Sequence, residues 1–176
     1  MPSFKAHKKE MTIKFDEDSP LEKNTTYMIN FGKAIVDVNE GNVLKNYSYV
    51  FSTGPTLDSL SISGNVRSVL SGKALKDALV FILPVSQDSL FGKKKANMFT
   101  MADSAGNFAL NNLRADTYRI YALKKPSGSE RIYNPETDEI AFLNDSLVLD
   151  KHIRDIQLNV FKEVPSKLRN RSDKID

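Results

Sequence analysis

The sequence predicts an all-β protein, an antiparallel β-sandwich of seven strands preceded by a partial β-sheet. Apolar residues alternate with polar ones along short segments, as in Tyr27, Ile29 and Phe31, and this period of two is typical of strands. The segments are separated by Gly, Asn and Asp, which tolerate the backbone conformations of tight turns. Helical periodicity is nearly absent. These three observations together favour sheets joined by hairpins.

The first third of the chain contains four expected strands, and apolar residues from three of them are expected to share one sheet face. The strands are expected near residues 11–15, 25–31, 34–37 and 47–53. The residues expected on the shared face are Met11, Ile13, Phe15, Tyr27, Ile29, Phe31, Tyr47, Tyr49 and Phe51. Exposure of each Phe or Tyr forfeits roughly 1.5–3 kcal/mol, and the chain before Met11 is too short to supply covering strands. We therefore expect residues 1–55 to be loosely held or self-associating, and residues 58–161 to fold alone.

The remaining strands form the expected sandwich. They are expected near residues 58–66, 78–84, 97–102, 107–111, 117–123, 139–143 and 153–161. The run from Ala78 to Leu83 is apolar on both faces, which predicts a central strand covered on each side. Pro55, in the sequence Gly54-Pro55-Thr56, stiffens the chain and cannot donate to a ladder, so it marks the expected domain junction.

Two acidic segments have to be weighed as turns or as calcium loops. Asp103-Ser-Ala-Gly106-Asn107 clusters acidic and amide oxygens around a glycine, but it lacks the bidentate Glu of the EF-hand spacing. A hairpin turn requires only a positive φ at Gly106 and capping of backbone amides by Asp103. The segment that holds Asp37, Asn39, Glu40 and Asn42 presents the same choice. We predict turns at both places.

The second part of the chain carries motifs of a known family. The motifs are Ile62-Ser-Gly64-Asn-Val66, Gly72-Lys-Ala-Leu75, Ala78-Leu-Val80, Asp103-Ser-Ala-Gly106-Asn-Phe108, Leu113 and Tyr118-Arg-Ile120. Their spacing resembles the transthyretin-like (prealbumin-like) domain, the carboxypeptidase regulatory module, over about residues 58–125 and more loosely to about 161. The resemblance implies a seven-stranded sandwich used for support or binding, without an active site of its own. Arg114-Ala115-Asp116 stands where the family has Pro-Gly, and Asp can occupy a left-handed turn position there.

The first part resembles a different family. Its motifs are Pro20-Leu21-Glu-Lys-Asn24-Thr25-Thr26-Tyr27, Asp37-Val-Asn-Glu-Gly41-Asn42 and Tyr49-Val-Phe51-Ser-Thr53-Gly54. They are similar to the C-terminal half of an S-layer-type bacterial Ig-like domain, over about residues 10–55. Whole domains of this kind need roughly 100 residues, so the chain is expected to be a fragment of a longer protein or to have a start site placed too late. The expected division is a partial Ig-like domain in 1–55, a transthyretin-like sandwich in 56–161 and a charged tail in 162–176.

The composition points away from several classes of function. The 176 residues include no cysteine, which removes disulfides, thiolate nucleophiles and the usual structural zinc sites. The net charge of +3 comes from interleaved charges of both signs, which does not indicate a nucleic-acid surface. No segment approaches the roughly 20 apolar residues of a membrane span. His7 and His152 lie in no catalytic or ligand pattern. We expect no catalytic residues, metal ions or cofactors.

The least regular segment of the second part, residues 127–142, is where a binding surface is expected, because binding residues concentrate on loops. Tyr133, Glu139 and Phe142 are the candidate residues. In the alternative, Ile140 and Phe142 fill the core while Glu139 faces water.

The sequence and its resemblances together favour a non-catalytic structural or adhesion-type module of a bacterial cell-surface or envelope protein. The alternative is an accessory module that binds glycan or peptide for a larger surface enzyme or transport system. The expected partners are neighbouring β-domains of the same full-length chain, with other surface proteins or glycan as further candidates. An export signal and a lipid-bearing cysteine of the lipoprotein type are expected outside this sequence.

Overall fold

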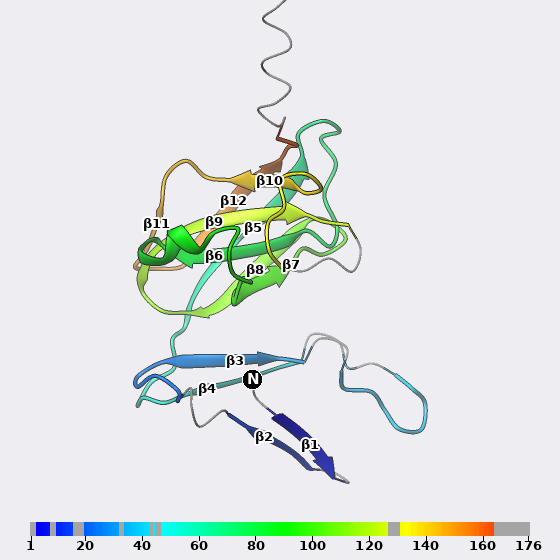
Figure 1. The fold of residues 1–176 in the computed structure, drawn as a ribbon, viewed down its shortest axis with the longest axis vertical. Coiled ribbons are helices and arrows are strands. Elements are labelled where there is room, and N and C mark those ends of the chain that lie inside the picture. The colour runs from blue at the N-terminus through cyan, green and yellow to red at the C-terminus, as the bar shows by residue number, and fades with distance from the viewer. Residues whose placement is uncertain are drawn as a thin grey trace, which may run out of the picture. The chain divides into compact units, whose positions relative to one another are not determined.

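The computed structural model describes residues 3–7, 10–15, 20–31, 34–42, 44, 47–126 and 131–163. The chain divides into two compact units, residues 1–58 and residues 59–176 (Figure 1). Both units are built from strands, and the sheets are mainly antiparallel, which confirms the all-β fold class. Most of the expected charged tail, residues 164–176, lies outside the described residues.

The first unit consists of two β-hairpins. β1 (Ser3–His7) pairs with β2 (Glu10–Lys14), and β3 (Thr26–Asn30) pairs with β4 (Ser48–Ser52). The two hairpins form separate two-stranded sheets. The expectation that the apolar residues of this unit line one sheet face is therefore wrong in one respect, because the face is divided between two sheets.

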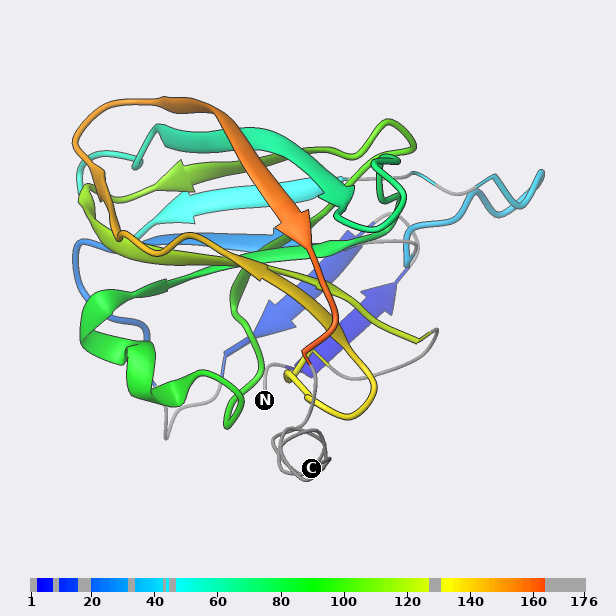
Figure 2. The ribbon, with the colours of Figure 1, turned by 90° about the horizontal axis from the view of Figure 1, so that it is seen from above.

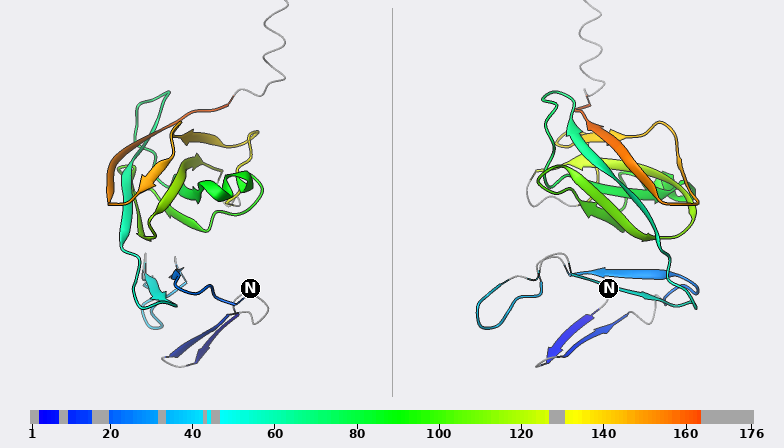
Figure 3. Two further views of the ribbon diagram at one scale, coloured as in Figure 1. Left: turned by 90° about the vertical axis from the view of Figure 1, so that its left-hand side faces the viewer. Right: turned by 180° about the vertical axis from the view of Figure 1, so that it is seen from behind.

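The second unit is a sandwich of two sheets. The three-stranded sheet has the order β12 (Ile153–Val160), β5 (Leu60–Ser68), β8 (Asn107–Leu113). The other sheet has the order β10 (Glu139–Phe142), β9 (Asp116–Lys124), β6 (Leu79–Pro84), β7 (Met98–Met101), and β11 (Leu147–Leu149) also pairs with β9. β5 and β12 are the first and last strands of the unit, and they pair in parallel (Figure 3).

One hydrophobic core fills the space between these sheets. The three-stranded sheet contributes buried residues such as Ile62 and Leu158, and the five-stranded sheet contributes Val80, Ile82 and Ile120. Because side chains of a strand alternate between its faces, the neighbours Leu79 and Phe81 lie on the outer face of the five-stranded sheet. They belong to a second buried cluster.

The outer cluster is covered by a short 3-10 helix, η1 (Val85–Leu90), and by loops. Figure 2 shows the three-stranded sheet, the five-stranded sheet and η1 in that order. Tyr121 of β9 stacks on Phe91, which follows η1, with ring centroids 4.3 Å apart. The hydroxyl of Tyr121 donates a hydrogen bond to Asp88 in η1, at 2.7 Å. β6 is thus a central strand covered on both faces, as its apolar run predicts.

Some details differ from the sequence-based expectations. Residues 34–37 form no strand, whereas β1 and β11 were not expected. The described part of the second unit has eight strands, and not seven, because the three-residue strand β11 is too short for a period of two to be recognised. The left-handed residue near the β8–β9 turn is Asn112, at φ 57°, and not Asp116, which begins β9.

Candidate binding surfaces

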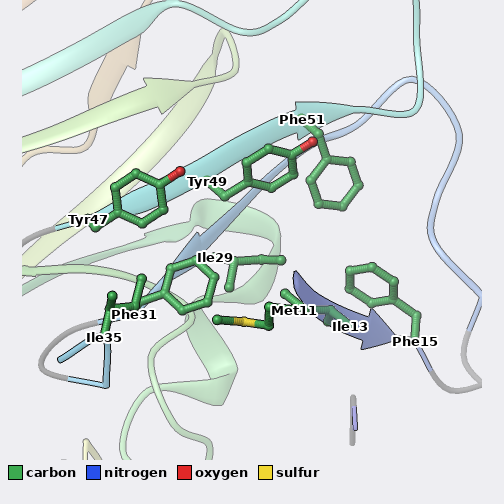
Figure 4. Close-up of a pocket in the computed structure, with 9 residues that line it drawn as sticks. All are labelled: Met11, Ile13, Phe15, Ile29, Phe31, Ile35, Tyr47, Tyr49 and Phe51. Carbon is green, nitrogen blue, oxygen red and sulfur yellow. The ribbon is translucent and has the colours of Figure 1, made fainter. Parts of the chain in front are cut away.

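An open apolar groove is the most prominent feature of the first unit. Its volume is about 550 Å³, and it lies between the two hairpins (Figure 4). The lining residues are Met11, Ile13, Phe15, Ile29, Phe31, Ile35, Tyr47, Tyr49 and Phe51. All but Ile35 are among the nine residues that the alternation places on one face. Tyr27 stacks on Phe51 with ring centroids 5.6 Å apart but is not part of the lining.

Aromatic contacts connect the walls of the groove. The ring centroid of Phe15, which follows β2, is 5.8 Å from that of Phe51 in β4. Phe31, which follows β3, lies 5.6 Å from Tyr47, which precedes β4. These tilted contacts are each worth about 0.5–1.5 kcal/mol beyond the area that they bury. The contact of Phe15 with Phe51 helps to hold the two hairpins against each other, whereas that of Phe31 with Tyr47 lies within the second hairpin.

The groove does not amount to a core. None of the described residues in the first unit is buried, and every buried hydrophobic residue among those that the structure describes lies in the second unit. Tyr49 at the rim remains 53% exposed. The lining has no ionisable group other than the two tyrosine hydroxyls. The groove is therefore better suited to bind an apolar surface, with side chains spaced as on a β-strand, than to bind a small polar substrate.

The three candidate residues of the second unit lie on β10 or on the segment before it. Tyr133 packs on Phe91 with ring centroids 5.2 Å apart, and its hydroxyl donates a hydrogen bond to Glu163 at 2.8 Å. Burial, followed by this hydrogen bond, raises the pKa of Tyr133. Phe142 lies edge-on to Phe161 at 5.9 Å and stays 43% exposed.

Glu139 points away from the other two candidates. Successive residues of a strand face opposite sides, so Glu139 shares its face with Ala141 of the main core, whereas Phe142 shares its face with Ile140 of the outer cluster. Glu139 accepts a hydrogen bond from Lys124 at 2.8 Å. The structure thus places Tyr133 and Phe142 on the outer side of the sheet and Glu139 on the other side.

A buried ion pair fixes the segment that leads into β10. Lys125 donates to a carboxylate oxygen of Asp138 and to the backbone carbonyl of Ile132, the latter at 2.7 Å. The same carboxylate accepts hydrogen bonds from the Asn134 amide and, through its other oxygen, from the Thr137 hydroxyl. Asp138 is completely buried. No sequence pattern predicts this pair, since its two residues are thirteen positions apart and lie in no periodic segment.

The two acidic segments form turns, as predicted. Asp103 accepts hydrogen bonds from the Ala105 and Asn107 amides, both at 2.8 Å, and Gly106 has a φ of 79°. The Asn107 amide is the main cause of the lowered pKa of Asp103. Asp37 caps the Glu40 and Asn39 amides in the same way, which lowers its pKa. Within the described residues, no group of three or more His, Cys, Asp or Glu side chains could hold a metal ion.

The comparisons with known proteins concern the first unit. The family of bacterial Ig-like domains matches residues 2–53. This match covers the two hairpins and the groove between them. No curated protein matches the chain. None of the helices in the described part of the chain is long and apolar enough to cross a membrane.

Proposed function

We propose that this chain is a non-catalytic structural module of a bacterial cell-surface or envelope protein. The match of residues 2–53 to bacterial Ig-like domains carries the proposal, because such domains are commonly parts of surface proteins. In this reading residues 1–55 correspond to the C-terminal half of an Ig-like domain of the S-layer type, and residues 56–161 to a transthyretin-like sandwich. Neighbouring β-domains of a longer chain are the proposed partners.

The use of the acidic side chains supports a structural role. Asp37 and Asp103 hold turns through backbone amides, and Asp138 pairs with Lys125 inside the second unit. Carboxylates committed to such contacts stabilise loops and are not free to transfer protons. We therefore assign these groups to the scaffold rather than to catalysis.

Labelling of intact cells tests the proposed location. The exposed Lys93 and Lys94 should react with a membrane-impermeant amine reagent when intact cells of the source bacterium are treated. A cytoplasmic protein serves as the control and should be labelled only after lysis. Labelling of this chain only after lysis would refute the surface location.

A second candidate function is binding of glycan or peptide on the outer side of the five-stranded sheet. The exposed ring of Phe142 and the nearby outer cluster favour it, because aromatic rings on a surface stack on ligands. Pull-down by isolated cell-wall glycan should weaken in Phe142→Ser and persist in Val148→Ser, which removes another exposed apolar side chain. If the glycan retains both variants equally, Phe142 does not bind it, and the scaffold role is the one that stands for this surface.

A further inference from the structure

A short hairpin turn at one end of the second unit exposes two apolar side chains at its apex. The chain leaves β5 at Ser68 and returns through Lys73, and Val69 and Leu70 are the first two residues of the turn between them. Leu70 is 90% exposed and Val69 is 56% exposed. Figure 1 shows this turn beyond the ends of the sheets, on the side where β12 ends. Val69 and Leu70 together are called the hairpin tip below.

Backbone hydrogen bonds fix the shape of the turn. The Ser68 amide donates to the Lys73 carbonyl and the Gly72 amide donates to the Ser68 carbonyl, both at 2.9 Å. Gly72 has a φ of 65°, which closes the turn in the left-handed region. The Val69 amide donates to the carbonyl of Val160, the last residue of β12, at 3.0 Å. The turn is therefore tied to two strands of the three-stranded sheet, and the exposure of the tip is set by this geometry.

The residue types at the tip are not those that an exposed turn requires. Such turns favour Gly, Pro, Asn, Asp and Ser, whose backbones or side chains suit the conformation. Ser71 and Gly72, later in the same turn, follow this rule. Val69 and Leu70 do not, and with this exposure they contribute little to the core. Local departures of this kind are expected at functional sites, so the tip indicates a contact outside the chain.

Basic side chains flank the tip. The ten residues from Arg67 to Lys76 include three cations, the third being Lys73, and no Asp or Glu. All three cations are exposed. Arg67 donates to the Gly72 carbonyl at 3.4 Å, which holds its guanidinium beside the turn. Lys76 lies 3.9 Å from Asp77, whereas neither Arg67 nor Lys73 pairs with a carboxylate among the described residues. The apolar tip therefore has positive charge directly behind it.

We propose that the hairpin tip docks on an anionic lipid surface. In this arrangement Val69 and Leu70 insert between the lipid headgroups, while Arg67 and Lys73 contact the phosphates. Transfer of exposed apolar side chains out of water is favourable, and attraction of nearby cations to anionic lipids adds to it. The hairpin supplies both contributions within a single turn.

The size of the tip favours lipid over a protein partner. A specific protein interface buries about 800 Å² on each partner and involves about 20–30 residues. Two side chains at an apex supply a small part of this area. Insertion into a lipid surface requires no complementary shape, so a projecting tip is sufficient. The expected binding is weak and reversible, because only two side chains insert. This inference rests on the hairpin alone and not on the proposed surface location.

Sedimentation of the full chain with vesicles of phosphatidylglycerol and phosphatidylcholine tests the proposal. The wild type should sediment with these mixed vesicles. Leu70→Ser removes the larger inserted side chain and should weaken binding at least about tenfold. Lys73→Gln should weaken binding to mixed vesicles about fivefold and leave binding to pure phosphatidylcholine unchanged. Val148→Ser is the matched control, because Val148 is 64% exposed on β11, outside the hairpin, and this variant should bind like the wild type.

Fluorescence locates the contact on the chain. The sequence contains no tryptophan, so Leu70→Trp introduces a single reporter. Its emission should shift to shorter wavelength on mixed vesicles and should be quenched by lipids with brominated acyl chains. The emission of Val148→Trp should stay unchanged. If the apolar groove of the first unit bound the vesicles instead, neither emission would shift.

Several results would overturn the proposal. A chain that does not sediment with mixed vesicles at millimolar lipid has no such docking site. Equal binding of Leu70→Ser and Val148→Ser, or an unshifted emission of Leu70→Trp on vesicles that bind the chain, would place the contact elsewhere. Equal binding of the wild type to mixed and to pure phosphatidylcholine vesicles would show that the cations do not take part. Loss of a protein partner in Leu70→Ser, without any binding to vesicles, would make the tip a protein contact.

Discussion

Lys124 and Lys125 are adjacent in the sequence but form ion pairs of very different burial. The Lys125 side chain is 10% exposed and its partner Asp138 is 0% exposed, whereas the corresponding values for Lys124 and Glu139 are 49% and 25%. Lys125→Met leaves a buried carboxylate without its cation and should lower the free energy of unfolding by about 3 kcal/mol. Lys124→Met should cost less than about 1 kcal/mol. Denaturant unfolding measures both losses of unfolding free energy. Equal losses would show that burial does not make the Lys125–Asp138 pair more stabilising than the Lys124–Glu139 pair.

Two glycines with positive φ also differ in their surroundings. At Gly106 (φ 79°) a Cβ would lie 2.5 Å from the carbonyl oxygen of Val66, whereas at Gly72 (φ 65°) it would meet nothing within 4 Å. Gly106→Val should therefore destabilise the chain by at least about 2 kcal/mol, through the left-handed backbone and the clash together. Gly72→Ala should cost about 1 kcal/mol, from the backbone alone. Thermal unfolding in which Gly106→Val leaves the midpoint unchanged would contradict the turn geometry.

The turn at Asp103 predicts a dependence of stability on acid pH. Its pKa is lowered below the ordinary value of 3.8, mainly by the Asn107 amide. Because the pKa of Asp103 is lower in the folded state, its ionised carboxylate stabilises the fold. This stabilisation is complete above the pKa of the unfolded state and is lost as the pH falls through the pKa of the folded state. Asp103→Asn should therefore flatten the loss of stability below pH 3.8. Unfolding curves measured from neutral to acid pH would refute this if both proteins respond identically.

At the scale of elements, the sequence predicts strands well where the period of two extends over five or more residues. β6 is expected as a doubly covered strand because its apolar run leaves no polar face, and the structure confirms this. β11 is missed because its three residues have too few alternations to be distinguished from a loop, and β1 is missed because Phe4 and Ala6 are its only apolar residues. The grouping of strands into sheets is also underdetermined, because alternation assigns faces but not hydrogen-bond partners. This is why the groove residues could be expected while their division between two hairpins could not.

The contrast between the units predicts their behaviour toward protease. The first unit has no buried residue among those described, and the second has a continuous core. Limited proteolysis at low protein concentration should remove residues 1–55 first and leave a fragment that begins between Thr56 and Ser59. Equal resistance of both units in the monomer would show that the first unit is stable without a cover.

At the scale of the whole molecule, the candidate site illustrates the limit of sequence-based reasoning. Tyr133, Glu139 and Phe142 lie within ten positions of one another, yet the strand places Glu139 and Phe142 on opposite faces. The alternation of Glu139, Ile140, Ala141 and Phe142 could have indicated this. The ion pair of Lys125 with Asp138 could not have been found, because it depends on the path of a loop without periodicity.

The parallel pairing of β5 with β12 determines how the second unit responds to tension. The chain enters the unit at Leu60, the start of β5, and leaves it after Val160, the end of β12, with register pairs running from Ile62–Ile153 to Ser68–Val160. The register is interrupted between Ile153 and Ile156 and continuous from Gly64–Ile156 to Ser68–Val160. A pull on the two chain ends therefore shears the pair, and the hydrogen bonds of the continuous part of this parallel ladder share the load. Under a pulling force, the unit should resist extension until these bonds break together.

Single-molecule stretching should show one high-force event for residues 59–163, and Gly64→Val, which sets a side chain against the Ile156 carbonyl, should lower that force. A gradual, low-force extension would mean that this ladder does not act as a mechanical clamp.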